Sequence, residues 1–522
     1  MRISGTIPAP LQALQSETLR VTFAYLLPTT ALCVALGWFH LGRASLWSDE
    51  VFSRYYYDVF GPGFLFTEGL WREPTPPTYP IVLRGWMALF GDSEPALRSL
   101  SLMCAALSVP LVFRLGRDLG TPREALAAAM LFALCPAVLY FAQEARVYAM
   151  TLLPVGVVLL AVAALLRDPR SRGAAWAYVG GATVGVYLHA TLVLLVASCA
   201  LVVGAVLLAR GGRAGWRALG RWAGLNGAVL AFGLPYLSHL AGASRGSGLD
   251  WIPPLRLHDL VGSVSAVVAG VLTPWPWLSG PLAAAVLGAL AVSVWRHRPS
   301  LGALAVLVLI PGVFVALATC VSLVRPILLP RVLFWTAIPL CVLAGRQMLQ
   351  AGRLRWAVAA STVLAFGVGL AVQETAPDGG KEPWRQALAR LAPELAQADL
   401  VVLSPRFNPL VLSYYASAIS PARVRVWDER LPPTIMTQAA DRLSIAPITR
   451  AQLLGEIDGG AAVWVLSNAV DLPTLEALQA IHPAQQTQAW RCGPNTCVEA
   501  AEWTTHATSK ITAKQANDGP HT

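Results

Sequence analysis

The sequence is short of charge. Asp, Glu, Lys and Arg make up only 13% of its 522 residues, whereas 55% are hydrophobic and the mean hydropathy is +0.55. Soluble proteins of this length carry about twice that share of charged residues. So little charge excludes an intrinsically disordered chain, and eight cysteines in so long a chain exclude a small disulfide scaffold. The composition indicates an integral membrane protein.

Lysine is almost absent, with three residues in the whole chain and none among the first 372. Those 372 residues hold 27 Arg and 14 Asp or Glu, a balance of +13, and the remainder holds 12 basic and 15 acidic residues, a balance of −3. A basic protein often binds nucleic acid, but most of these arginines lie between apolar segments. The excess of cytoplasmic Arg found in membrane proteins accounts for them better.

Long apolar segments are plentiful. A bilayer core about 30 Å thick needs roughly 20 apolar residues per helix, and by that measure we expect about eleven transmembrane helices. They centre on residues 22–42, 95–115, 124–141, 148–166, 174–190, 191–209, 222–240, 277–295, 300–322, 332–348 and 355–372. A further stretch at 258–272 is interpreted as an interfacial or re-entrant helix.

Loop charge predicts the orientation. Every second connection is rich in arginine and is therefore expected in the cytoplasm. The other connections, 43–94, 141–148, 242–257 and 323–331, would then face outward, together with the residues that follow 372. For a bacterial inner membrane the outer side is the periplasm, and Cys492 and Cys497, on either side of Gly-Pro-Asn-Thr, could form a disulfide there. The six other cysteines lie in apolar segments and are expected to be small buried residues.

Residues 373–507 show a different pattern, with helical spacing at 382–398 and short strand-like runs at 400–403, 424–427 and 462–466. We expect a small periplasmic α/β domain there, and residues 508–522 are expected to be disordered.

Acidic residues gather in the first outer connection, which holds seven of the 14 acids found before residue 373. Asp49 and Glu50 come directly after the first apolar segment, at the membrane surface, where carboxylates are costly and tend to be functional. A solvated loop is the plain alternative.

Arginines also lie in connections expected on the outer side, where the excess of cytoplasmic Arg does not explain them. Arg146 interrupts two apolar segments, and Arg325 and Arg331 flank a Pro-Ile-Leu-Leu-Pro run. Pairing with an acid of the 43–94 connection is the structural explanation, and a clamp on a lipid phosphate is the functional one, since a guanidinium binds phosphate with two hydrogen bonds. His189 ends an apolar segment at the same side; it could be a hydrogen-bonded structural residue or touch a substrate.

A family resemblance now becomes specific, and the motifs that carry it occur in order on the outer face. Trp47-Ser48-Asp49-Glu50 looks like the acidic motif in the first outer loop of membrane C-type glycosyltransferases. Four later segments also resemble motifs of the same enzymes. They are the segment from Thr75-Pro76-Pro77-Thr78-Tyr79 to Glu94, residues 96–101, Gln143–Tyr148 and Pro330-Arg331. The chain thus resembles the protein O-mannosyltransferase and aminoarabinose transferase superfamily, family 39-like, strongly over residues 40–150 and more weakly to about 350. The tail shows no resemblance.

The resemblance implies the C-type fold and an inverting transferase that moves a sugar from a polyprenyl-phosphate donor to an envelope glycolipid, polysaccharide or protein. It implies Asp49 as the general base, with Glu50 able to share that role. Arg146, with Arg331 or Arg98, would stabilise the leaving phosphate. The residues expected to line the substrate site are Glu73, Tyr79, Glu144, Tyr148 and His189.

Two other functions remain open at this point. A transporter or flippase for polyprenyl-linked glycans would share the many helices and the outer arginines, but we find no internal repeat of the kind that transporters often show. An inactive scaffold for glycan assembly is the second. No metal-binding pattern is visible, although two acids and a phosphate could hold a divalent cation.

Overall fold

The computed structural model describes residues 22–66, 76–243, 252, 254–275, 277–350, 352–405, 407–417, 419–427, 435–468, 471–490 and 498–503. The chain forms two compact units, Met1–Lys381 and Glu382–Thr522. The first unit therefore extends beyond residue 372, where the apolar segments end. The expected disordered segment 508–522 lies outside the described residues.

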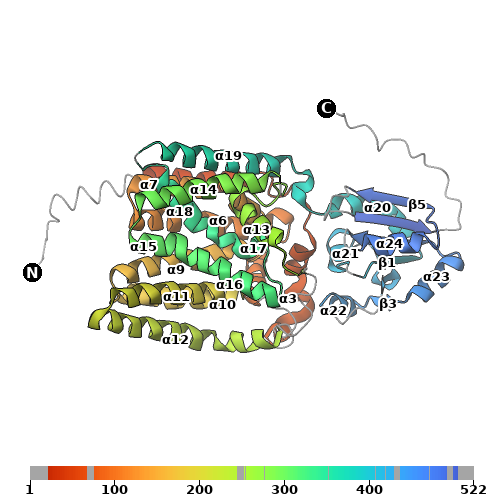
Figure 1. Ribbon diagram of the computed structural model, residues 1–522. Helices are drawn as coiled ribbons and strands as arrows, with labels where there is room; N and C mark the ends of the chain where they lie inside the picture. Colours follow the sequence, from red (N-terminus) through yellow and green to blue (C-terminus); the bar gives the residue numbers. More distant parts are fainter. Residues whose placement is uncertain are drawn as a thin grey trace, which may run out of the picture. The chain divides into compact units, whose positions relative to one another are not determined.

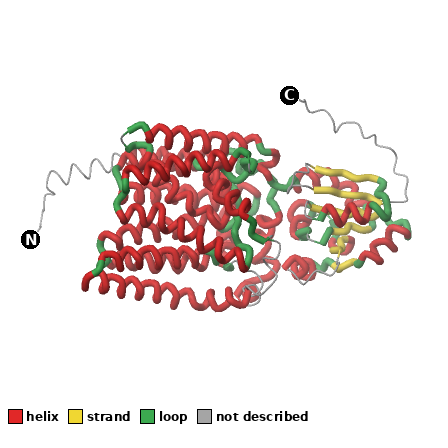
Figure 2. The backbone as a smooth tube through the Cα atoms, in the orientation of Figure 1, coloured by secondary structure: helices red, strands yellow, loops and turns green. Residues whose placement is uncertain are grey.

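Within its described residues the first unit consists of helices and the loops between them (Figures 1 and 2). The helices in chain order are η1 Thr22–Leu26, α2 Leu27–Trp38, α3 Ser48–Phe66, α5 Thr78–Phe90, α6 Glu94–Leu119, α7 Pro122–Ala133, α8 Pro136–Ala142, α9 Tyr148–Arg167, α10 Arg172–Leu188, α11 Leu192–Arg210, α12 Gly212–Ala243, α13 Leu257–Ala269, α14 Ser279–His297, α15 Leu301–Leu304, η3 Ala305–Leu309, α16 Ile310–Val324, α17 Pro330–Leu333, η4 Phe334–Thr336, α18 Ala337–Gln347, α19 Leu354–Thr375 and η5 Pro377–Gly380.

Each of the eleven expected apolar segments coincides with one of these helices or with a run of them. Among the described residues, six helices are long and apolar enough to cross a bilayer, or seven if α7 and α8 form one span. That pair is bent by 53°, and the bend coincides with Pro136, which cannot continue a helix without a break. The chain is a multi-pass membrane protein, and the number of eleven spans stays a prediction. The stretch at 258–272 is also helical, as α13.

Small residues let the helices approach closely. A Cβ on Gly116 of α6 would lie 2.8 Å from Cα of Ala125 in α7, and one on Gly345 of α18 would lie 2.5 Å from the backbone of Ala128. Such close approach gives the van der Waals contact that holds helices together in lipid, where the hydrophobic effect contributes little. Five of the six cysteines expected to be buried are buried, but Cys320 of α16 is exposed, because it lies on a helix that is only one-third buried.

The second unit contains a six-stranded sheet in the order β3-β2-β1-β4-β6-β5. Strands β1 to β4 are parallel, and β6 pairs antiparallel with both β4 and β5. The strands are β1 Leu400–Leu403, β2 Val424–Trp427, β3 Ala446–Ile448, β4 Val463–Asn468, β5 Gln486–Trp490 and β6 Val498–Trp503; the helices are α20 Trp384–Gln397, α21 Leu410–Tyr415, η6 Pro421–Arg423, α22 Ile435–Arg442, α23 Arg450–Asp458 and α24 Leu472–Gln479. Strands β1 and β4 are buried at every residue, as expected for central parallel strands covered on both faces.

Candidate functional site

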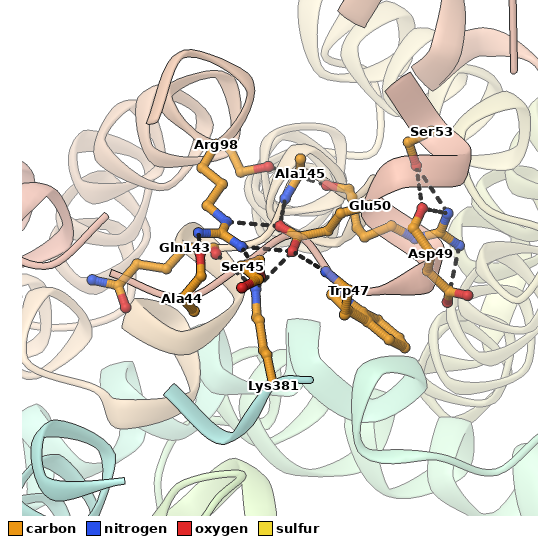
Figure 3. A network of polar contacts seen from close by, with 12 residues as sticks. Ala44, Ser45, Trp47, Asp49, Glu50, Ser53, Arg98, Gln143, Ala145 and Lys381 are labelled. Atoms are coloured by element: carbon orange, nitrogen blue, oxygen red, sulfur yellow. Dashed lines mark hydrogen bonds and ion pairs between the residues drawn. The ribbon is translucent and has the colours of Figure 1, made fainter. Parts of the chain in front are cut away.

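Asp49 and Glu50 lie in the first turn of α3. Successive residues of an α-helix project about 100° apart, so the two carboxylates meet different surroundings. Figure 3 shows Glu50 directed toward Arg98, Ala145 and Lys381, whereas Asp49 lies on the other side of the network, near Ser53.

Glu50 is fully buried and has no room for a substrate. Its carboxylate accepts hydrogen bonds of 2.8 Å each from Nε and Nη2 of Arg98, 3.1 Å from Nζ of Lys381 and 2.7 Å from the backbone N–H of Ala145. Burial alone would raise the pKa of Glu50, but Arg98 and Lys381 hold it at about 2. A carboxylate with so low a pKa is a poor base, so this environment does not fit the catalytic role expected for Glu50.

All the hydrogen-bond donors of Arg98 are also used inside the protein. A guanidinium has five N–H donors. Those of Arg98 donate to both oxygens of Glu50 and to the carbonyls of Leu41, Ala44 and Ser45, all at 2.8 to 2.9 Å. The side chain is 1% exposed. The phosphate contact expected of Arg98 does not fit this geometry, because every N–H already donates inside the protein. Arg98 instead fixes the loop before α3 and the first turn of that helix.

Asp49 is in a more open setting, with its side chain 32% exposed. Its Oδ2 lies 3.6 Å from Nη2 of Arg146 and 3.5 Å from Nη1 of Arg331. Arg146 comes from the turn between α8 and α9, and Arg331 comes from α17. Nη1 of Arg146 also donates to the backbone carbonyl of Asp49 at 3.1 Å and to Oγ of Ser53 at 2.9 Å. Two guanidiniums thus converge on one accessible carboxylate.

Aromatic rings border this cluster. The ring of Tyr148, at the start of α9, lies 5.8 Å from the guanidinium carbon of Arg146 and 5.7 Å from that of Arg331. The ring of His189, just after α10, is 6.0 Å from that of Tyr148. Cations over aromatic faces are attracted to them, so Tyr148 keeps both guanidiniums together. The structure therefore places Asp49, Arg146, Arg331, Tyr148 and His189 in one region.

Glu144 and Tyr79 are both buried and interact electrostatically with Arg146. Burial raises the pKa of Glu144 to about 7; Lys381 and Arg331 lower that value and Glu50 adds to it. Burial also raises the pKa of the Tyr79 phenol well above its ordinary value. The region thus holds a buried carboxyl group that titrates near neutral pH, beside the guanidiniums.

Three of the expected residues, Glu73, Cys492 and Cys497, lie outside the described residues. Among those that are described, no group of three or more His, Cys, Asp and Glu side chains could hold a metal ion. A cavity of about 260 Å³ lies between α13, the start of α14 and the segment before Arg331. Its lining is mostly apolar, with the neighbouring His258 and Asp259 among the polar members.

Sequence reasoning missed Lys381. It lies more than 300 residues from Glu50 in the chain, and no local pattern connects the two. One signal was present, because Lys381 is the first lysine of the chain and lies just beyond the last apolar segment. A lone lysine in an arginine-rich membrane protein is a reason to look for a special contact.

The comparisons with known proteins agree with this picture. Residues 74–239 match the family model of dolichyl-phosphate-mannose-protein mannosyltransferases. No curated protein sequence matches the chain. Among solved structures, ArnT from Cupriavidus metallidurans bound to undecaprenyl phosphate superposes with a TM-score of 0.58 at 12% identity, covering 92% of this chain and 98% of that one. The apo state of the same protein gives the same TM-score and coverage at 14% identity.

The family match covers Tyr79, Glu144, Arg146, Tyr148 and His189, and the fold match extends over nearly the whole chain. At these identities the structural likeness concerns the fold. Together with the order of the motifs, it confirms the resemblance to the membrane C-type glycosyltransferases that the sequence predicts: residues 74–239 are similar to the mannosyltransferase family model, and the chain shares the fold of ArnT.

Proposed function

We propose that this protein transfers a sugar from a polyprenyl-phosphate donor to an acceptor of the cell envelope, at the outer face of a bacterial inner membrane. The observation that carries the proposal is the convergence of Arg146 and Arg331 on Asp49, from segments far apart in the chain. The family model of mannosyltransferases that use dolichyl phosphate mannose supports it, as does the ArnT structure, whose bound ligand is undecaprenyl phosphate.

The two guanidiniums would bind the donor phosphate. Their contacts with Oδ2 of Asp49, at 3.5 and 3.6 Å, are longer than hydrogen bonds. A phosphate offers more charge and can accept bidentate hydrogen bonds from each guanidinium. It would therefore compete well with Asp49 for both arginines. Their positive charge would also stabilise the phosphate as it leaves with the electron pair of the broken bond.

Asp49 would act as the general base. In this step the acceptor O–H loses its proton to Asp49, its oxygen bonds to the anomeric carbon, and the bond between that carbon and the phosphate oxygen breaks. The acceptor attacks from the face opposite the phosphate, so the anomeric configuration inverts. Proton transfer would come late, as the sugar gains oxocarbenium character. We assign this role to Asp49 and not to Glu50, because the Glu50 carboxylate is buried and bonded to Arg98 and Lys381.

The remaining residues of the region would shape the site. Tyr148 holds the two arginines side by side, and His189 extends the aromatic wall. Tyr79 and Glu144 are buried near Arg146, and Glu73, two residues before the Thr75–Tyr79 motif, is proposed for the acceptor side from the family resemblance. The periplasmic location of the Glu382–Thr522 unit and its contact with an acceptor remain parts of the proposal; deletion of residues 382–522 with normal transfer by folded protein would overturn that contact.

The test is transfer of radiolabelled sugar from synthetic polyprenyl-phosphate sugars to envelope extracts, comparing purified wild-type protein with Asp49→Asn. We expect transfer by the wild type and its loss in the variant, with equal yield and equal monodispersity in detergent. Equal transfer by both proteins would move the base elsewhere. No transfer with any donor would contradict the enzyme and favour a flippase, which movement of lipid-linked glycans in liposomes would then reveal.

A further inference from the structure

The segment that connects the two units in the chain returns to the buried acid of the candidate site. After α19 ends, residues 376–381 run through η5 to Lys381, the last residue of the first unit. Its ammonium donates to Oε2 of Glu50 and to the backbone carbonyl of Gln143, both at 3.1 Å. The Lys381 side chain is only 6% exposed.

From these contacts we propose that Lys381 is a positioning residue for the sugar transfer, holding the turn that carries Asp49 and the turn that carries Arg146 in fixed relation. The inference rests on the proposed function for its consequence in catalysis, although the positioning itself can be measured without any substrate.

The two partners of Lys381 explain why it acts on both turns. Glu50 is the immediate neighbour of Asp49, and Gln143 lies three residues before Arg146. Lys381 therefore joins the side chain of Glu50 to the backbone of Gln143, on either side of the contact between Asp49 and Arg146. Glu50 reinforces the same connection, because it accepts a hydrogen bond of 2.7 Å from the N–H of Ala145.

Local backbone geometry directs the lysine inward. Gly379 and Gly380 have φ of 61° and 72°, a left-handed conformation that other residues rarely adopt. A Cβ on Gly380 would lie 2.6 Å from Leu272, so only glycine allows the segment to pack this closely. The following residue then enters the protein instead of facing solvent.

Exposed contacts hold the end of α19, just before this segment. Nη1 of Arg43 donates to the carbonyl of Glu374 at 2.7 Å, and Nδ1 of His40 lies 2.9 Å from the Glu374 carboxylate. Both partners come from the loop between α2 and α3, which leads directly into Asp49 and Glu50. These contacts provide a matched control, because they tie the end of α19 to that loop without reaching Glu50.

The positive charge of Lys381 contributes to its contacts in addition to the volume of its side chain. Glu50 faces Arg98 and Lys381, and Glu144 is a second buried carboxyl group in the field of the same ammonium. Removing the ammonium leaves Arg98 as the remaining cationic partner of Glu50 and takes one hydrogen-bond donor from Oε2 of Glu50 and one from the carbonyl of Gln143. Loss of a donor to such acceptors inside a protein is unfavourable. We therefore expect the two turns to shift or loosen when Lys381 is replaced by an uncharged residue of similar length.

The experiment compares Lys381→Met, Lys381→Arg and the control Glu374→Gln in the full-length protein in detergent. The first readout is hydrogen–deuterium exchange in peptides that cover residues 44–53 and 143–148. We expect faster exchange at both in Lys381→Met, exchange nearer to wild type in Lys381→Arg, and no change in Glu374→Gln. Unchanged exchange in Lys381→Met would overturn the inference.

The second readout is steady-state transfer from a polyprenyl-phosphate sugar. We expect kcat to fall about tenfold or more in Lys381→Met with a smaller change in the donor KM, because positioning acts on the transition state. Arg at this position should restore part of kcat. If the wild type transfers sugar and Lys381→Met does so at the same rate, the inference fails alone. If the wild type transfers nothing, the proposed function fails and the exchange data still decide the positioning.

Should Lys381→Met give no folded protein, Lys381→Gln takes its place, since its amide can still donate a hydrogen bond but carries no charge. Faster exchange at both turns with a retained thermal midpoint would support the inference, and wild-type exchange together with wild-type kcat would count against it.

Discussion

Asp49 and Glu50 are neighbours in the chain, yet their carboxylates belong to separate charge networks. That of Glu50 is enclosed by Arg98 and Lys381, whereas that of Asp49 is partly exposed between Arg146 and Arg331. A single turn of helix thus carries both an acid that holds the structure and an acid that is partly exposed. The predictions below follow from that division.

Asp49→Asn should lower kcat by about 10²–10⁴, the usual contribution of a general base. Its fold should survive, because Asp49 accepts only long contacts from its two arginines. Asp58→Asn is the matched control on the same helix, where Asp58 pairs with Arg54 and Arg84 away from the site. Rates of sugar transfer measure the difference, and comparable losses in both variants would point to disruption of α3.

Arg331→Lys should raise the donor KM about tenfold or more, because an ammonium cannot replace the bidentate contact of a guanidinium with phosphate. Arg84→Lys, an exchange of the same kind in an exposed ion pair, should leave KM unchanged. Competition by a polyprenyl phosphate that carries no sugar gives an independent measure of phosphate affinity. An unaltered inhibition constant in Arg331→Lys would remove Arg331 from the phosphate site.

Donor binding should weaken as pH rises through about 7, the pKa to which burial raises Glu144. Above that pH the ionised Glu144 interacts with Arg331 and Arg146 and competes with a phosphate for them. Lys381 lowers the pKa of Glu144, and Glu50 raises it. Below that pH Glu144 is neutral and the arginines are available. Glu144→Gln should flatten the dependence of KM on pH, and an identical profile in this variant would assign the titration to another group.

Glu50→Gln should destabilise the fold by about 3–5 kcal/mol, the typical result of breaking a buried ion pair on one side. Asp92→Asn, in an exposed ion pair with Arg54, should change stability by about 1 kcal/mol or less. Thermal midpoints in detergent compare the two. Because the pKa of Glu50 is lowered to about 2, its ionised form contributes stability above its ordinary pKa, and that contribution is lost as pH falls toward 2.

Gly380→Ala should destabilise the first unit, since its φ of 72° is unfavourable for alanine and the added Cβ would meet Leu272. Gly367→Ala, within α19 where a Cβ has open space around it, should be neutral or stabilising. Thermal midpoints again provide the comparison, and equal midpoints for the two variants would show that the segment tolerates another backbone conformation.

Much of the helical unit was predictable because lipid imposes length and composition on each helix. Hydropathy located every apolar segment that the structure shows as helix, including α13, which is too short to count as a span. The bend between α7 and α8 was missed, because Pro136 lies within an apolar run whose length alone suggests one continuous helix. Strands β1 and β2 also lie where short apolar or alternating runs indicated them.

The candidate site was predictable only in part. The order of the motifs brought Asp49, Arg146 and Arg331 together correctly, because all three lie on connections at one side of the membrane part. The sequence does not reveal that Arg98, unlike Arg146 and Arg331, is fully bonded inside the protein. Its five hydrogen bonds include three to backbone carbonyls of a loop that has no sequence signature. Glu50 is enclosed by three distant segments, those of Arg98, Ala145 and Lys381, which only the assembled fold brings together.

Because the chain has so few lysines, proteolytic cleavage after Lys381 can report whether this side chain remains buried. A protease that cuts only after lysine finds no site in the chain before Lys381, and the next two are Lys510 and Lys514. In the folded protein Lys381 is enclosed against Glu50, so cleavage there requires its departure. The yield of a fragment ending at residue 381 would therefore count the molecules in which this side chain has left its place.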